Sequence, residues 1–403
     1  MRWNWNGRPE GREREDNPAR QKQMIAVVGA GICGLGIAWQ LAKAGHSVAL
    51  FDRGAAGRET SWAAGGMLAP HVEAEPGEEA LLPLLLESRS LWADFAAELE
   101  ADAGMTVDYR DEGTLVVGLD RDDRERIDFV LAYYRDLGLP VEALTGREVL
   151  RREPHLSRRV TAGLFSRLDH QVDNRKVVQA MTAAFLAANG ILREHCPVLQ
   201  LEWSGGSVRG LITADGDFPC DTVVLSTGPW ARDLRGLPEE LLPPVRPVKG
   251  QMVAVAMPRS EPLLRHVVWI PDGYLIPRLD GRLIVGGTME DVGFDDRLTA
   301  GGMMDILRNA WEALPAIYDL PLIETWIGYR PTSRDDAPIL GPSGKDGLVY
   351  ALGHHRNGIL LAPVTAKGIA SYIGTGVLPE SLSAYTMDRF SRHRSSLGTR
   401  HSL

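Results

Sequence analysis

The amino-acid sequence predicts an α/β protein with two domains whose segments alternate along the chain. Three observations support this prediction: a strand, glycine turn, helix and strand near the N-terminus; a mixture of helical and strand-like segments after it; and a composition typical of globular chains. The chain has 403 residues, of which 44% are hydrophobic and 24% are charged. This length is enough for one large core or for two domains.

The first unit is a strand over residues 25–28 that ends in a glycine-rich turn and continues into an apolar helix over 32–44. Gly29 permits the tight turn, Gly31 lets the backbone approach a pyrophosphate, and Gly34 lets the helix pack on the strand. The helix N-terminus offers unpaired N–H groups and a dipole that favour anions. The spacing therefore predicts a Rossmann-like site for a dinucleotide.

A second strand over 47–51 leads to Asp52, whose carboxylate is placed to accept hydrogen bonds from ribose hydroxyls. A glycine turn alone can also serve helix packing, but two strands, a helix and an acid at this spacing favour cofactor binding. The residues expected to contact the cofactor in this unit are Gly29, Gly31, Ile32, Cys33, Gly34 and Asp52.

Residues 1–23 differ in character from the rest of the chain. They contain repeated Arg, Glu, Asn, Gly and Pro and almost no aliphatic side chains, so they cannot bury enough apolar surface to offset the entropy of ordering. We expect a flexible N-terminal extension, with Met24 as the start of the native protein. A docking arm is the alternative role for this segment.

The remaining elements alternate between helical and strand-like patterns. An amphipathic pattern predicts a long helix over 81–103, and Asp173 with Asn174 predicts the start of another that runs to about residue 189. Short strands are expected at 198–203, 208–213, 222–226, 251–256, 274–277 and 283–285. The expected nucleotide-binding domain comprises 24–80, 155–235 and 326–403, and the expected mixed-sheet substrate domain comprises 81–154 and 236–325.

Charge and cysteine content argue against several classes of function. The net charge is −9 and no long basic run is present, which argues against nucleic acid as the main partner. No apolar run is long enough to span a bilayer, and the N-terminus lacks the apolar core of a signal peptide, so we expect a cytoplasmic protein without membrane contact. Cys33, Cys196 and Cys220 have neither CxxC nor metal-ligand spacing, so no metal site is expected.

The sequence contains one dinucleotide unit. The glycines at 286–287 and the turn at 341–344 lack the strand, spacing and helix of a second unit. Flavin enzymes that take electrons from NAD(P)H often carry two such units. A single unit in so long a chain fits FAD bound lengthwise, with an organic substrate that reduces it directly.

Three longer motifs make this interpretation more specific. Residues 60–70 (TSWAAGGMLAP), 328–331 (GYRP) and 353–363 (GHHRNGILLAP) resemble the glycine oxidase branch of the D-amino-acid oxidase family, and the similarity extends from Met24 to Arg389. The resemblance implies the FAD-binding fold of that family with an interleaved substrate domain. It also implies oxidative deamination of glycine, sarcosine or D-alanine to an imine and then an oxo acid, with O₂ reduced to H₂O₂.

The resemblance has further implications for cofactor and partners. In many bacteria this branch supplies the thiazole of thiamine, so handover of the imine to a thiazole synthase is one implied step. Relatives suggest a homo-oligomer. The FAD is expected to be non-covalent, because no cysteine lies near the motifs around Arg330 and Arg356.

The resemblance assigns additional cofactor contacts. Small side chains at 63–66 allow a loop to lie against the planar flavin ring, although a plain structural turn is the alternative interpretation. A helical stretch expected to begin at Gly358 would direct its positive dipole at the flavin. The implied contacts are Ser61, Ala63, Ala64, Gly65, Gly66, Met67, Val198, Thr227, Gly228, Arg356, Asn357, Gly358, Ile359 and Leu360.

For the substrate, the resemblance assigns catalytic roles to Arg330 and Tyr274, which would share the carboxylate. A planar guanidinium can grip a carboxylate through two parallel hydrogen bonds. Without the resemblance, Arg330 reads as a structural ion-pair residue and Tyr274 as a core residue. Arg356 and Met289 match substrate-binding positions that line the pocket. Some relatives carry a histidine where this chain has Asp272, which leaves the substrate preference open.

Two alternative functions share this fold. A quinone-linked D-amino-acid dehydrogenase would need membrane contact, and the sequence shows no amphipathic anchor. An FAD-dependent oxidoreductase that modifies aminomethyl-uridine in tRNA is the other alternative, against which the acidic charge counts. Peroxide yield under air separates the first from an oxidase, and a tRNA gel shift tests the second.

Overall fold

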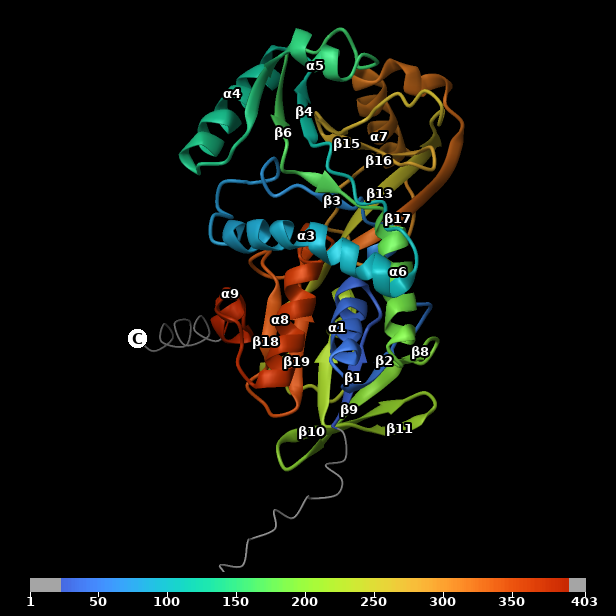
Figure 1. Cartoon of the computed structure of the whole chain (residues 1–403), viewed down its shortest axis with the longest axis vertical. Helices are drawn as coiled ribbons and strands as arrows, with labels where there is room; N and C mark the ends of the chain where they lie inside the picture. Colours follow the sequence, from blue (N-terminus) through green and yellow to red (C-terminus); the bar gives the residue numbers. More distant parts are fainter. Residues whose placement is uncertain (1–22, 391–403) are drawn as a thin grey trace, which may run out of the picture.

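The computed structural model describes residues 23–390, which form two large sheets with helices packed against them (Figure 1). The expected flexible extension, apart from Gln23, lies outside the described residues. Within the described part, no helix is long and apolar enough to cross a membrane.

A six-stranded sheet contains the predicted glycine unit. In order across the sheet its strands are β18 (Ile339–Pro342), β19 (Leu348–Leu352), β12 (Thr222–Leu225), β1 (Met24–Val28), β2 (Ser47–Phe51) and β8 (Ile191–Arg193). All are parallel except β18. The chain passes from β1 to β2 on one side, and β12 lies on the other, so a crevice opens at the carboxyl end of β1. In open α/β sheets such a crevice is the usual ligand site.

Helices cover one face of this sheet and a small antiparallel sheet covers the other. The helices are α1 (Ile32–Lys43), α3 (Leu82–Ala103), α6 (Asn174–Ala187) and α8 (Ala362–Thr375), and the small sheet consists of β9 (Val198–Ser204), β10 (Ser207–Thr213) and β11 (Gly216–Pro219). Burial on both faces explains why β1 and β2 are almost wholly apolar. The predicted cap of α6 is confirmed, because Asp173 accepts hydrogen bonds from the N–H groups of Arg175 and Lys176.

An eight-stranded mixed sheet forms the second part, drawn in the upper half of Figure 1. In order its strands are β17 (Leu322–Thr332), β13 (Arg246–Ala256), β16 (Arg282–Gly286), β15 (Gly273–Pro277), β14 (Val267–Ile270), β4 (Thr114–Gly118), β6 (Ala162–Ser166) and β5 (Glu142–Thr145). Helix α7 (Ala300–Ala313) packs on one face, and α4 (Arg121–Asp136) lies near β4 and β6.

The remaining elements are short. They are α2 (Thr60–Ala63), β3 (Met67–Leu68), α5 (Gly146–Arg152), β7 (His170–Gln171), η1 (Gly228–Trp230), η2 (Glu239–Leu241), η3 (Pro315–Asp319), η4 (His355–Asn357), α9 (Glu380–Ser383) and η5 (Met387–Phe390). Strands β3 and β7 pair and connect the loop after α2 to the segment that precedes α6.

Three segments pack differently from the expected domain division. Strand β17, most of which lies in the expected nucleotide-binding segment 326–403, pairs with β13 in the eight-stranded sheet. Strand β6, expected within the nucleotide-binding segment 155–235, pairs with β4 and β5 in the eight-stranded sheet. Helix α3, expected in the substrate domain, buries Trp92 and Phe95 in the helical core beside Trp39 of α1. The apolar pattern of an element shows that one face is buried, but not which sheet covers it.

Candidate active site

One cavity of about 1690 Å³ extends from the glycine turn to the eight-stranded sheet. This volume exceeds the ~300–1,000 Å³ typical of a site for one drug-sized ligand, so the cavity has room for a large cofactor together with a substrate. Its wall combines the carboxyl ends of β1 and β2 with the loop after α2 and the segment around η4.

The glycine turn leaves no room for side chains. Gly29 has a φ of +102°, and a Cβ atom there would lie 2.5 Å from the carbonyl oxygen of Ser226. A Cβ atom at Gly34 would lie 1.9 Å from the carbonyl oxygen of Gly29. Gly34 faces this turn rather than the cavity, as expected for a packing glycine. The N–H of Ile32 at the start of α1 donates to Oγ of Ser61 (2.9 Å). Gly31 supplies no side-chain cap and the first turn has no acidic residue, so the helix dipole at this end still favours an anion.

Asp52 lies at the cavity wall directly after β2. Its two carboxylate oxygens accept hydrogen bonds from the backbone N–H groups of Ala30 (2.7 Å) and Gly54 (2.8 Å). Burial raises the pKa of this carboxyl, and the two N–H groups oppose that shift. A carboxylate oxygen has more than one acceptor site, so each can still accept from a ribose hydroxyl.

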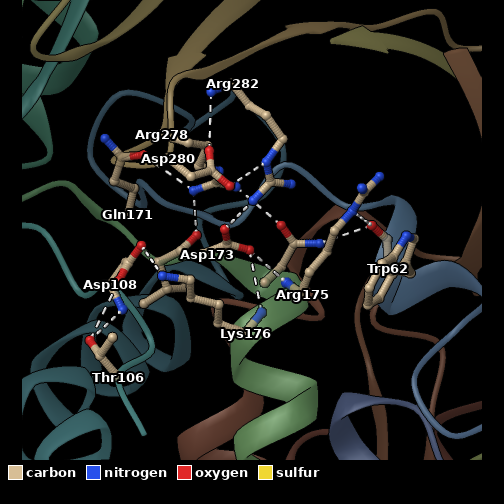
Figure 2. Close-up of polar contacts among 12 residues, drawn as sticks. Trp62, Thr106, Asp108, Gln171, Asp173, Arg175, Lys176, Arg278, Asp280 and Arg282 are labelled. Atoms are coloured by element: carbon tan, nitrogen blue, oxygen red, sulfur yellow. Dashed lines mark hydrogen bonds and ion pairs between the residues drawn. The ribbon is translucent and has the colours of Figure 1, made fainter. Parts of the chain in front are cut away.

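The loop at 63–66 is held by the buried side chain of Arg278, which Figure 2 shows in a polar network with Gln171, Asp173 and Asp280. Arg278, 5% exposed, donates to the carbonyl oxygens of Gly65 (2.6 Å) and Val172 (2.5 Å) and to Oδ1 of Asn174 (3.1 Å). Burial lowers the pKa of Arg278 to about 10, although Asp173 opposes the shift, so the guanidinium remains charged at neutral pH. Arg278 thus holds the loop through the Gly65 carbonyl oxygen, while residues 63–66 still line the cavity.

Arg330 and Tyr274 lie beside each other on the wall of the cavity. Arg330, on β17, donates from Nη1 to the carbonyl oxygen of Thr288 (3.1 Å). Burial raises the pKa of Tyr274 on β15, and the nearby Arg330 guanidinium opposes that shift. Gly250 of β13 makes room for this arrangement, because a Cβ atom there would lie 2.7 Å from Nη1 of Arg330. The Tyr274 hydroxyl donates to Sδ of Met252 (3.2 Å), a weak acceptor that a carboxylate could replace, and a neighbouring guanidinium and phenol are suited to hold a carboxylate.

Arg356 lines the cavity, but it already has carboxylate partners. Its Nη1 and Nη2 atoms bind Oε1 and Oε2 of Glu78 at 2.9 and 2.5 Å, and its Nε atom lies 3.7 Å from Oε2 of Glu73. Glu78 occupies one N–H of each terminal nitrogen, and a guanidinium has five N–H donors, so Arg356 can contact a further ligand only with the donors that remain. The role of Arg356 in substrate binding stays a prediction. Glu73 and Glu78 were missed as partners of Arg356 because they lie far from it in the sequence. Their segment, 73–79, has the pattern of a solvated acidic segment.

Glu73 is a further cavity residue that the sequence did not single out. Its side chain is 14% exposed, and burial raises its pKa to about 8 despite the opposing charge of Arg356. The fully buried Asp169 adds to this rise, and it binds His71 two residues before Glu73. Near neutral pH the carboxyl of Glu73 is therefore largely protonated.

The segment after η4 differs from its predicted conformation. Residues 358–361 form turns that line the cavity, and α8 begins at Ala362 rather than at Gly358. Pro363 explains the difference, because proline fits the first turn of a helix but cannot lie deeper within it. The predicted helix start at Gly358 is therefore wrong by four residues, although Leu361 N–H bonds to the Asn357 carbonyl at 2.8 Å. The direction of the helix dipole towards the flavin stays a prediction.

The other predicted residues lie around the same cavity. Met289, 64% exposed, is at its rim. Among residues 23–390, the buried hydroxyl of Thr227 has no hydrogen-bond partner, as expected where a ligand supplies one. The predicted cofactor residues that line the cavity are Gly29, Gly31, Ile32, Cys33, Asp52, Ser61, Ala63, Ala64, Gly65, Gly66, Met67, Val198, Thr227, Gly228, Arg356, Asn357, Gly358, Ile359 and Leu360.

These features fit FAD. The glycine turn and helix end suit its pyrophosphate, Asp52 suits its ribose, and the long cavity leads from Val198 to the loop at 63–66. The unpartnered Thr227 hydroxyl supports the same placement. Within the described residues, no group of three His, Cys, Asp or Glu side chains is arranged to hold a metal ion.

Comparisons with known proteins agree with this geometry. The chain is 34% identical over 368 residues to glycine oxidase from Geobacillus kaustophilus, covering 91% of this chain and 96% of that protein. It is 35% identical to the bifunctional protein ThiO/ThiG from Synechocystis, covering 91% of this chain and 54% of that longer protein. The crystal structure of the Geobacillus kaustophilus glycine oxidase superposes with a TM-score of 0.84 and 31% identity, covering 94% of this chain and all of that one.

A family model also matches most of the chain. The family model described as FAD dependent oxidoreductase matches residues 24–372. That match includes the glycine turn, the loop at 63–66 and both Arg330 and Tyr274. The chain belongs to the DAO family of FAD-dependent oxidoreductases.

Proposed function

We propose that this protein oxidises glycine and other small amines, including sarcosine and D-alanine, to the imine, which hydrolyses to an oxo acid. The observation that carries the proposal is the proximity of Arg330 and Tyr274 on the wall of the cavity that fits FAD. FAD, when bound, supplies the two-electron oxidation of the bond between the α-carbon and the nitrogen and passes the electrons to O₂, which forms H₂O₂.

The chain's own residues orient the substrate. Arg330 binds the carboxylate through its guanidinium, and the Tyr274 hydroxyl shares the same group. Both side chains start from strands of one sheet, so their separation is fixed before substrate arrives. Orientation of this kind supplies most of the rate enhancement when no acid or base has to be moved into place.

The proposal extends to cofactor attachment and partners. The FAD is bound without a covalent link, since the cavity contains Cys33 alone among the cysteines and burial raises the pKa of that thiol to about 12. The imine is passed to a thiazole synthase for thiamine, which the ThiO/ThiG relatives support by joining two activities in one chain. The protein acts in the cytoplasm as a homo-oligomer.

The test is the stoichiometry of the reaction in air-saturated buffer. With glycine we expect one H₂O₂, one ammonia and one glyoxylate for each O₂ consumed, and acid precipitation should release all of the FAD from the protein. Oxidation of D-alanine that needs an added quinone and yields no peroxide would instead indicate a dehydrogenase. Failure of all small amines together with a salt-sensitive tRNA gel shift would indicate the tRNA-modifying alternative.

A further inference from the structure

A row of side chains crosses the eight-stranded sheet, starting at Tyr274 and leading away from Arg330. Trp269 of β14 lies directly opposite Tyr274, Val116 of β4 lies opposite Trp269, and Leu164 of β6 lies opposite Val116. Residues paired directly across neighbouring strands point to the same face of a sheet. All four line the cavity, so the cavity continues along the row beyond the proposed carboxylate site.

Burial shows which part of this row borders open space: Leu164 is fully buried and Tyr274 is also buried, so the open part lies in front of Trp269 and Val116. Val116 and Trp269 are half-buried, whereas all other residues of β4 and β14 are buried. Neighbouring strands lie ~4.8 Å apart, so Val116 is about 10 Å from Tyr274 along the sheet. This is the length of an arylalkyl group rather than of a methyl group.

The opposite wall comes from one face of α4. Arg126, Phe129, Val130 and Tyr133 have the spacing i, i+3, i+4 and i+7, which places them on one side of a helix. All four line the cavity, and Phe129 is 66% exposed. An apolar surface that is exposed on the wall of a cavity is typical of a ligand-binding site.

The charged groups beside this space disfavour a second carboxylate. Arg356, on the loop side, is already bound by Glu78 through both terminal nitrogens. Glu73 offers no positive charge, and Arg308 is bound by Asp305 at 2.7 Å. Arg126 is exposed, where water already solvates it. A carboxylate buried here would lose its hydration and gain, in place of a buried cation, only the indole N–H of Trp269, which has no hydrogen-bond partner within the described residues.

We infer that the space bounded by Trp269, Val116, Phe129, Val130 and Tyr133, here called the annex, binds an aryl group carried on the nitrogen of an N-substituted glycine. The inference rests on the proposed function, because Arg330 and Tyr274 mark the carboxylate end. The reaction is unchanged: the α-carbon is oxidised, O₂ takes the two electrons, and hydrolysis releases glyoxylate and the substituted amine.

The test uses two substitutions of opposite size at Val116, with kcat/KM measured for glycine and for N-benzylglycine. Val116→Phe fills the annex, so the ratio of N-benzylglycine to glycine should fall about tenfold, as expected when a phenyl ring loses its burial. Val116→Ala enlarges the annex, so the ratio for the bulkier N-(naphthylmethyl)glycine should rise. General damage to the fold would lower kcat/KM for all substrates together. It cannot lower the ratio in Val116→Phe and raise it in Val116→Ala.

Binding without turnover gives an independent measurement. Acetate and 3-phenylpropionate lack the amine, so calorimetry on the FAD-loaded protein reports their dissociation constants alone. We expect 3-phenylpropionate to bind about tenfold more tightly than acetate in the native protein and to lose that advantage in Val116→Phe. Equal affinities in the native protein would overturn the inference.

Other outcomes of these experiments distinguish failure of the inference from failure of the proposed function. If glycine is not oxidised at all, the proposed function fails, whatever the annex binds. If glycine is oxidised but Val116→Phe lowers kcat/KM for glycine and for N-benzylglycine equally, the annex is only an access path and the inference is wrong. Preference for iminodiacetate over N-benzylglycine, or for D-phenylalanine over N-benzylglycine, would also overturn it, by showing a polar subsite or attachment through the α-carbon.

Discussion

Substitution of Gly250 by alanine is predicted to disable substrate binding while it leaves the fold intact. Gly250 pairs with Gly328 in the register of β13 and β17, and the side chain of Arg330 passes over it. The new Cβ atom would lie 2.7 Å from Nη1 and 3.2 Å from Cζ of Arg330, whereas ordinary contacts are 3.4–4 Å. The guanidinium, at the end of a flexible side chain, has to give way.

The size of the effect follows from that displacement. A shift of about 1 Å in a group that orients substrate can lower the rate by ~100-fold. We therefore expect kcat/KM for glycine to fall by about 10- to 100-fold, which corresponds to about 1.4 to 2.7 kcal/mol of lost transition-state binding. The melting temperature should change less than activity, because the larger movement is that of the Arg330 side chain, while the carbonyl oxygen of Thr288, 3.1 Å from the new Cβ atom, has to shift by only a few tenths of an ångström.

The assay is steady-state oxygen consumption with glycine, together with the FAD content and melting temperature of each variant. Gly301→Ala is the matched control, because a Cβ atom at Gly301 of α7 meets nothing within 4 Å. We expect this control to keep native kinetics. A fully FAD-loaded Gly250→Ala protein with the native KM and kcat would refute the assignment of Arg330 to the substrate.

Three further predictions concern individual side chains. Arg330→Ala should raise the KM for glycine at least ~100-fold, as loss of a bidentate carboxylate contact would, with FAD content unchanged; a native KM in the loaded variant would contradict this. Arg278→Met leaves the carbonyl oxygens of Gly65 and Val172 without their donor, at a cost of ~1–3 kcal/mol per buried unpaired group. The dissociation constant of FAD, measured by the fluorescence of released FAD, should therefore rise about tenfold. An unaltered dissociation constant would contradict the role of Arg278 in holding the loop. The raised pKa of Glu73 means that its charged form is disfavoured in the folded state. As pH rises from about 5 towards 8, the free energy of unfolding of the native protein should therefore fall relative to that of Glu73→Gln, by up to ~1.4 kcal/mol per pH unit in urea unfolding. Parallel pH profiles of the two proteins would contradict this.

Local features of the fold could be predicted from the sequence because they depend on neighbouring residues. The turn at Gly29, the helix that follows it and the Asp173 cap each require only a few consecutive positions, and each is present. The start of α8 was misplaced because an apolar run resembles a helix wherever it begins, and only Pro363 limits how far the helix extends.

The candidate site depended on contacts between distant segments. The expectation for Arg330 and Tyr274 came from the resemblance, since nothing in their own surroundings brings β15 and β17 to one cavity. The pairing of Arg356 with Glu78 joins positions 278 residues apart, and the role of Gly250 depends on the register of two strands. Neither property leaves a local pattern in the sequence.

The central claim is that Arg330 and Tyr274 select a small amine by its carboxylate on the wall of the FAD cavity. The most direct test is anaerobic mixing of the FAD-loaded protein with glycine or with methylamine, which lacks the carboxylate, while flavin absorbance is recorded. The account predicts rapid loss of oxidised-flavin absorbance with glycine and none with methylamine. Equal bleaching by both amines, or bleaching by neither, would contradict it.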